Sequence, residues 1–179
     1  MVRVANSREE DISSSPSKIA GEGKVKLAAT KDGKLRALEC VYHTSCGAYS
    51  DTGPNMASAV ATDCSGPYNI ENVFCDSFCV YTNHTYSTSY RGFGHSLSTF
   101  GIEMAMNKLA HKPNMDLLEI RKINALKPGD LSPTQDPITP SNTGDLVGCL
   151  DRLKEITDWD SSKNIKNNNG KYITTGISC

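Results

Sequence analysis

The segment that most constrains the fold of this chain is TSYRGFGH, residues 88–95, because it joins a predicted strand to the clearest helical pattern. Residues 68–82 are rich in β-branched and aromatic side chains, which indicates a strand. The two glycines of the turn let backbone N–H groups approach a ligand closely. The following helix adds unpaired N–H donors and the positive end of its dipole, which suits an anionic ligand. A lone Gly-x-Gly is weak support, since most such turns only redirect the chain.

A β-hairpin is predicted upstream of this turn. Residues 24–30 and 35–43 read as two strands around the turn sequence KDGK at 31–34. Residues 55–64 are rich in Ala and Met and predict a short helix. Residues 1–20 are polar and Ser-rich without periodicity, so we expect an irregular N-terminal arm followed by one domain over residues 21–179.

Three helices and a final strand are predicted after the turn. In residues 95–111 apolar side chains recur at spacings of three and four. The apolar stripe consists of Leu97, Phe100, Gly101, Met104, Ala105 and Leu109. Asp116 is the expected N-cap of a second helix to about residue 126, with Glu119 in capping-box register. Residues 145–159 predict the third helix and residues 171–179 the final strand, so the order indicates an α+β fold rather than repeated βαβ units.

Composition narrows the classes of function. Hydrophobic residues make up 37% of the 179, which permits only a modest core and suggests a chain that buries surface against a partner. The net charge of −1 gives no basic balance for nucleic acid or an anionic membrane. There is no apolar run of bilayer length and no signal-like segment at the N-terminus. We therefore expect the seven cysteines to be free thiols in a reducing, cytoplasmic compartment.

Common cofactor and metal motifs are not matched. Leu97 stands where the dinucleotide fingerprint needs its third glycine, and neither a P-loop nor H-E-x-x-H occurs. Cys75 and Cys79 would face the same side of a strand but lie about 13 Å apart, too far to share a zinc ion. We predict that they are buried structural thiols, and His43-x-x-Cys46 is equally weak as a metal motif. No catalytic dyad or carboxylate pair can be assembled from local sequence.

The remaining candidate residues keep alternative interpretations. His95 either contacts a ligand or is a surface residue of the first helical turn, whereas His111 at a helix C-terminus is expected to be structural. The triplet Asn83-His84-Thr85 has the form of a glycosylation site, without a secretory context to support it. Arg91, with an aromatic residue on either side in the loop, either contacts a ligand or cofactor or braces the loop, and residue type alone does not decide between them.

The segment at residues 89–94 resembles a sequence motif of a known protein family. SYRGFG at residues 89–94 resembles the [AS]-[FY]-R-G-[FY]-G segment of the molybdenum hydroxylases, the xanthine dehydrogenase and aldehyde oxidase family. SGPYNIENV at 65–73 resembles its G-P-Y-x-I-P-N-V, with Glu71 where proline is usual, and VYTN at 80–83 resembles its V-Y-T-N. KDGKL at 31–35 and GAY at 47–49 fit the upstream hairpin. The resemblance is collinear from about residue 8 to the end.

The helical region carries further matches. Glu103 and Leu109-Ala110 fit the helix after the motif. The residues that match the family's D-P-x-E-x-R-x-x-N…G-D pattern are Asp116, Glu119, Arg121, Asn124 and Gly129-Asp130, with Leu117 where proline is usual. The resemblance therefore implies that the fold is part of a molybdopterin-binding domain.

The resemblance also implies a cofactor and a chemistry. In this family a molybdenum–molybdopterin cofactor hydroxylates an electron-poor carbon of an aldehyde or N-heteroaromatic substrate, and no protein side chain ligates the metal. Electrons leave through iron–sulfur clusters and FAD on other domains or subunits, which would be partners of this chain. The family's cofactor contacts map onto Ser89, Tyr90, Arg91, Gly92 and Phe93, and Phe93 would also pack against a heteroaromatic substrate.

Departures from the family pattern limit these implications. The chain lacks the family's upstream G-G-x-F-G segment and the downstream region with its catalytic Glu. Purine-oxidising members carry a Glu-Arg pair where gapless placement puts Ser58-Ala59, which argues against xanthine. The segments at 83–85 and 91–95 resemble nicotinate-type hydroxylases that split this subunit. We therefore expect a fragment or split subunit that is inactive alone and forms one wall of the site. The alternative is a truncated, non-catalytic remnant.

Overall fold

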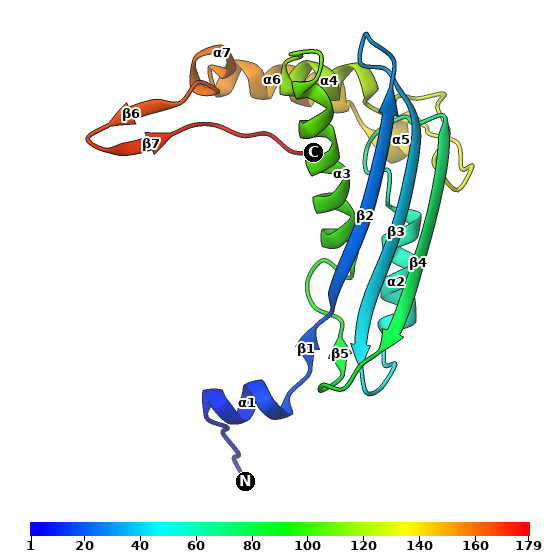
Figure 1. Cartoon of the computed structure of the whole chain (residues 1–179), viewed down its shortest axis with the longest axis vertical. Coiled ribbons are helices and arrows are strands. Elements are labelled where there is room, and N and C mark those ends of the chain that lie inside the picture. The colour runs from blue at the N-terminus through cyan, green and yellow to red at the C-terminus, as the bar shows by residue number, and fades with distance from the viewer. The chain divides into compact units, whose positions relative to one another are not determined.

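The computed structural model describes residues 1–179, apart from the side chain of Asn168, and divides the chain into two compact units. Unit 1 consists of Met1–Lys26, Glu39–Cys64 and Phe74–Gly101. Unit 2 consists of Leu27–Leu38, Ser65–Val73 and Ile102–Cys179. The long strands and the longest helix contribute residues to both units, and the α+β composition agrees with the expected fold class (Figure 1).

A three-stranded sheet contains the predicted hairpin. Strands β2 (Ala20–Ala29) and β3 (Leu35–Gly47) form the antiparallel hairpin, and β4 (Asn72–Tyr81) lies beside β3 in the same direction (Figure 1). The parallel β3 and β4 are connected through helix α2 (Gly53–Thr62), which confirms the short helix. The predicted strand 68–82 begins later than expected, because Tyr68 forms only an isolated bridge with Ala125.

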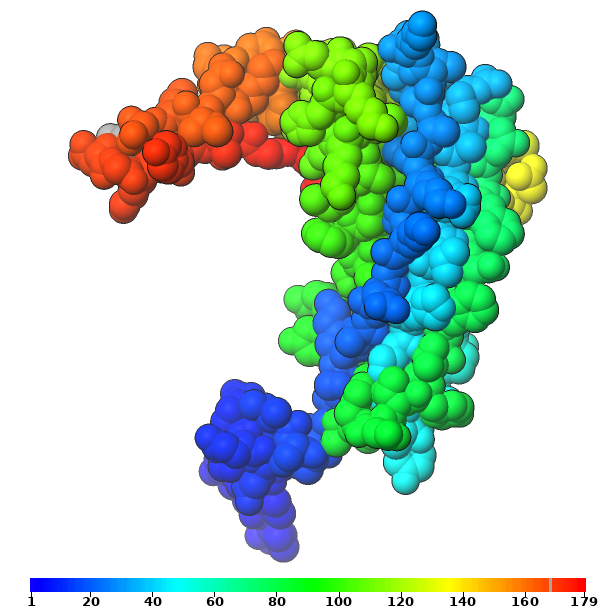
Figure 2. Space-filling model, in the orientation of Figure 1, coloured from blue at the N-terminus to red at the C-terminus, as the bar shows by residue number. Residues whose placement is uncertain are grey.

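In unit 1, helices cover one face of the strands. The start of the long helix packs on α2, and the buried apolar residues of this unit are Cys40, Tyr42, Cys46, Met56, Ala57, Val60 and Cys64. The opposite face of the strands carries no helix in Figure 2, where the blue, cyan and green strands lie open to the viewer. On β4 the large apolar residues Phe74 and Phe78 are exposed, and the Phe78 ring stacks on His43 with 5.2 Å between ring centroids.

The N-terminal arm is more ordered than the sequence analysis expected. Residues 8–14 form helix α1 (Arg8–Ser14), which begins at a capping box: the Ser7 hydroxyl accepts from the Glu10 N–H, and the Glu10 carboxylate accepts from the Ser7 N–H. Strand β1 (Ser17–Lys18) then pairs in parallel with β5 (Ser87–Thr88), which directly precedes the motif turn. The prediction of an irregular segment was wrong because it rested on apolar periodicity, which such a short polar helix lacks.

The longest helix, α3 (His95–His111), has the predicted bounds but not the predicted buried face. Phe100 and Met104 of the apolar stripe are 67% and 41% exposed. The residues that are buried instead are Ser98, Ile102, Glu103, Met106 and Ala110. The buried face differs because apolar periodicity cannot register that Glu103 turns inward to a cationic partner.

That partner is Arg121 of α4 (Leu117–Asn124), and the pair forms the polar centre of unit 2. The Arg121 side chain is fully buried and donates through Nε and Nη2 to one Glu103 oxygen, while the Tyr68 hydroxyl donates to the other. Nη2 also donates to Asn107 Oδ1 at 2.9 Å, and Nη1 to the Leu117 carbonyl at 2.8 Å. Burying these charges is tolerable because each is paired and hydrogen-bonded.

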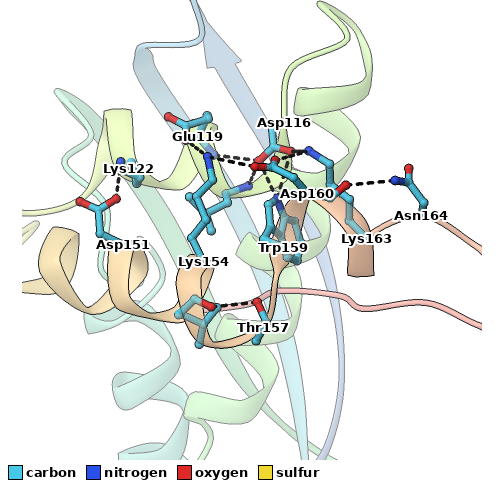
Figure 3. Close-up of polar contacts among 12 residues, drawn as sticks. Asp116, Glu119, Lys122, Asp151, Lys154, Thr157, Trp159, Asp160, Lys163 and Asn164 are labelled. Atoms are coloured by element: carbon cyan, nitrogen blue, oxygen red, sulfur yellow. Dashed lines mark hydrogen bonds and ion pairs between the residues drawn. The ribbon is translucent and has the colours of Figure 1, made fainter.

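Asp116 caps α4, as predicted, and also anchors the following helices. Its carboxylate accepts from the N–H groups of residues 118 and 119, from Trp159 Nε1 at 3.0 Å and from Lys163 Nζ at 2.6 Å (Figure 3). Burial opposes its ionisation, but these hydrogen bonds hold the pKa of Asp116 below its ordinary value. Glu119 points to Lys154, 3.8 Å away, so it forms an ion pair there.

The third helix is shorter than predicted. It is α6 (Leu146–Ile156), begun by the Asp145 N-cap, and Trp159 starts the separate short helix α7 (Trp159–Ser162), where its ring is buried. The Pro-rich connection before α6 contains one helical turn, α5 (Pro140–Thr143).

The end of the chain corrects another prediction. The expected final strand 171–179 is reduced to β7 (Lys171–Ile173), which pairs antiparallel with the short strand β6 (Lys166–Asn168). The connection is Asn169-Gly170, with positive φ at both residues, as a two-residue hairpin turn requires. In the part of the chain that the structure describes, no helix is both long and apolar enough to cross a bilayer.

Candidate functional site

The motif turn between β5 and α3 lies within unit 1 and has an unusual backbone. Gly92, Phe93 and Gly94 have φ values of 105°, 39° and 87°, so three consecutive residues occupy the left-handed region. Two backbone hydrogen bonds hold the turn: Phe93 N–H donates to the Tyr90 carbonyl at 2.9 Å, and His95 N–H donates to the Gly92 carbonyl at 2.8 Å. Positive φ disfavours a non-glycine residue, so Phe93 is held in a strained conformation.

The two glycines have different surroundings. A Cβ at Gly94 would lie 2.7 Å from the Met56 carbonyl oxygen and 3.2 Å from a Val60 methyl group, so only glycine lets the turn pack on α2. A Cβ at Gly92 would meet only the Ser96 side chain at 3.5 Å. The Gly92 side of the turn is therefore open, and its backbone can be approached closely.

Unused hydrogen-bond donors gather on this turn. Among the hydrogen bonds of the described residues, none uses the backbone N–H of Arg91, Gly92 or Gly94. The Arg91 side chain is exposed, and no ion pair or hydrogen bond in the described part of the chain involves it. This disfavours the interpretation that Arg91 braces the loop. A guanidinium group beside free N–H groups at a helix start is suited to an anionic group.

The five predicted contact residues, 89–93, follow one another on this turn. Residues 89–92 are exposed and Phe93 is half-buried. The five residues lie together because they are consecutive, so no contact between distant segments is needed to assemble them. The position of an anionic ligand on them remains a prediction.

Contacts from other segments of unit 1 hold the start of the turn. The Thr88 hydroxyl donates to the Asp51 carboxylate, and this hydrogen bond lowers the pKa of Asp51. The Lys18 ammonium lies 5.9 Å from the centre of the Tyr90 ring. Gly47 has φ 74°, and a Cβ there would clash with the Thr85 carbonyl oxygen. The GAY segment therefore lets the chain before the motif pass close to β3.

The histidine candidates are occupied by protein contacts. The His95 Nδ1 atom lies against the Asp63 carboxylate and the side chain is partly exposed, which favours the interpretation as a surface residue of the first helical turn. His84 Nε2 lies 2.8 Å from Ser45 Oγ. His43 stacks on Phe78, whereas the buried Cys46 thiol points to the Val80 carbonyl at 3.2 Å, so the two do not form a metal pair.

Cys75 and Cys79 were predicted to be buried structural thiols, but both are only partly buried. Cys75 and Cys79 do not share a site: a Cβ at Gly53 would touch both Cys46 and the Cys79 sulfur, while Cys75 lies with Cys40 and Cys64. The three Sγ atoms of that second group all lie within 4.8 Å of one another. Hydrogen bonds from Cys40 and then from Cys64 lower the pKa of the Cys75 thiol. Sequence reasoning missed this group because its members are distant along the chain.

The residues matched by the D-P-x-E-x-R-x-x-N pattern belong to the framework of unit 2. Asp116 and Arg121 form the contacts described above. The Asn124 side chain accepts from the Leu35 N–H at 2.8 Å and donates to the Gly33 carbonyl at 2.9 Å, which fixes the hairpin turn. These side chains are committed to the fold, so the open turn at 89–94 is the stronger candidate for ligand contact.

A family model and individual relatives were found by comparing the sequence with known proteins. Residues 1–125 match the model of the molybdopterin cofactor-binding domain. The nicotinate dehydrogenase large molybdopterin subunit of Eubacterium barkeri is 34% identical over 154 residues, which cover 86% of this chain and 36% of that protein. The aldehyde oxidoreductase of Megalodesulfovibrio gigas is 41% identical over 134 residues, covering 74% of this chain and 14% of that protein.

A solved structure agrees in fold. The aldehyde oxidoreductase from Desulfovibrio gigas, activated with dithionite and sulfide, superposes with a TM-score of 0.75 at 34% identity. The match covers 82% of this chain and 16% of that one. This chain therefore spans only a minor part of the relatives that it matches.

Proposed function

This chain belongs to the molybdopterin cofactor-binding domain family, and from that premise we propose that residues 89–93 contact a molybdenum–molybdopterin cofactor. The observation that carries the proposal is the open, strained turn with unused N–H groups at residues 91 and 92 beside the unpaired Arg91 side chain. These donors fit the anionic and polar atoms of a phosphorylated pterin. In this assignment Ser89, Tyr90 and Phe93 complete the contact surface.

The chain would contribute one wall of a cofactor and substrate site. The bound cofactor supplies oxidative hydroxylation of an electron-poor carbon, and the protein supplies binding and orientation. The substrate class is an aldehyde or an N-heteroaromatic ring, with Phe93 positioned against it. The similarity to a nicotinate dehydrogenase subunit supports the heteroaromatic alternative, and Ser58-Ala59 in α2 offers no charged pair for a purine.

Turnover would require other parts of the enzyme. We assign the remaining molybdopterin-binding region, iron–sulfur clusters and an FAD module to partner subunits or segments, in keeping with the small share of each relative that this chain covers. The general base would also come from there, because no carboxylate lies among residues 89–94. The purified chain with cofactor should therefore show no dye-linked oxidation of aldehydes or nicotinate, and turnover by it alone would contradict this division.

Cofactor retention tests the contact itself. The full chain is incubated with molybdenum cofactor released from a carrier protein, and molybdenum and pterin are measured after gel filtration. Arg91→Ala should weaken retention about 10- to 100-fold, as expected for one lost charged hydrogen bond. Arg152→Ala, an exposed arginine of α6 in unit 2, is the matched control and should retain cofactor like the wild type.

Two results would reject the proposal. Equal retention by Arg91→Ala and wild type would remove the turn from the cofactor site. No retention by the wild type, together with non-cooperative unfolding, would favour the remnant alternative, because that alternative predicts a poorly folded chain that binds nothing.

A further inference from the structure

Three cysteines from separate segments of unit 1 form a compact sulfur cluster. Cys40 lies in β3, Cys64 follows α2, and Cys75 lies in β4. Their Sγ atoms all lie within 4.8 Å of one another. Cys40 and Cys64 are fully buried, whereas Cys75 is partly exposed, so the cluster has one accessible side.

The fold holds these sulfur atoms in place. The Thr44 hydroxyl donates to the Phe78 carbonyl, and the Cys46 thiol donates to the Val80 carbonyl, so these contacts hold β3 beside its neighbour β4. The Asn72 side chain donates to the Arg36 carbonyl nearer the start of both strands, so Cys40 and Cys75 each lie between contacts that join β3 to β4. The turn after α2 adds Cys64, whose N–H donates to the Ala61 carbonyl. Backbone pairing therefore preorganises the cluster.

We propose that Cys40, Cys64 and Cys75 bind one soft cation, Cu(I), through their three sulfur atoms. Soft thiolate ligands select Cu(I), zinc and iron–sulfur clusters over harder cations. Metal–sulfur bonds of about 2.3 Å place the ligand sulfur atoms roughly 4 Å apart, so binding requires only a small contraction of the cluster.

The ligand count favours Cu(I) over Zn²⁺. Structural zinc is almost always held by four protein ligands. Within the described residues, no further His, Cys, Asp or Glu joins this group of three. Three sulfur atoms complete the coordination of Cu(I), whereas zinc would need a water or an added ligand at the Cys75 side.

Binding involves no redox change. Each thiol that becomes a thiolate ligand forms one sulfur–copper bond and releases one proton to solvent, and the copper remains Cu(I) throughout. The site is independent of the proposed cofactor contact, because none of the three cysteines lies in the turn and the ion is a different ligand.

Competition with a chromophoric Cu(I) chelator under anaerobic, reducing conditions tests the proposal. The full-length wild type should bind one Cu(I) per chain. Cys75→Ser should weaken binding more than about 100-fold, which exceeds the loss expected when a residue that only hydrogen-bonds to a metal ligand is removed. Cys79→Ser is the matched control, since Cys79 lies four residues further along β4, is also partly buried and is outside the cluster. It should bind copper like the wild type.

Alkylation of the wild type keeps the test independent of variant folding. Cu(I) should slow the reaction of Cys75 and leave that of the exposed Cys149 unchanged. The proposal is overturned if Cys75 gains no protection, if Cys75→Ser folds and binds copper like the wild type, or if Zn²⁺ displaces Cu(I) from the chain.

Discussion

At the scale of single residues, Gly92 and Gly94 of the motif turn are glycines for different physical reasons. Gly94 satisfies both a positive φ and a contact with the α2 backbone that no side chain could share, whereas Gly92 satisfies positive φ beside open space. A motif search treats the two alike. Only the packing distances separate the glycine needed for folding from the glycine available for ligand approach.

Gly94→Ala should therefore destabilise the protein by about 2–4 kcal/mol, because left-handed strain adds to overpacking against Met56. Gly92→Ala should cost less, about 1–2 kcal/mol, since only the strain applies. Urea unfolding measures the loss of unfolding free energy for both variants, provided that the denaturant m-value is unchanged. Gly176→Ala, which meets open space without positive φ, is the control. Equal losses for Gly94→Ala and Gly92→Ala would contradict the difference in packing.

At the scale of elements, the polar side chains of α4 are committed to contacts that hold the fold together. Its N-cap Asp116 holds Trp159 and Lys163, its buried Arg121 neutralises Glu103, and its last residue, Asn124, fixes the hairpin turn. The family-like spacing of these residues follows from helical geometry, since each must reach a different neighbouring segment from one short helix.

Arg121→Met should cost about 3–5 kcal/mol of folding free energy, because it leaves Glu103 buried without its cation. Arg152→Met removes an exposed pair with Glu155, whose side chains are 70% and 68% exposed, and should change stability by less than about 0.5 kcal/mol. Thermal or urea unfolding compares the two. A loss for Arg121→Met no larger than that for Arg152→Met would show that the buried network contributes little.

Local sequence patterns predicted most elements but not their long-range partners. The hairpin, α2, α3 and α4 follow from turn chemistry, apolar periodicity and capping, which act over a few residues. The inward face of α3 depends on Arg121, and the cysteine cluster depends on the register of β3 with β4, so neither could be read from spacing. Helix α1 was missed although its S-x-x-E capping signal, Ser7 to Glu10, was present in the sequence.

At the scale of the whole molecule, the chain exposes large apolar side chains that its own core does not bury. One face of its sheet carries the exposed Phe74 and Phe78, and the curated relatives that it resembles are several times longer. The candidate site is likewise open on the Gly92 side. Both features agree with a chain that contributes one part of a larger active centre.

The central claim is that the turn of residues 89–93 contacts the molybdenum cofactor. Hydrogen–deuterium exchange of the full chain, with and without cofactor, tests it most directly, because the amides of Arg91 and Gly92 are exposed and have no partner among the described residues. We predict that cofactor slows their exchange at least about tenfold, as expected when each gains a hydrogen bond. Bound cofactor with unchanged exchange at these amides would contradict the account.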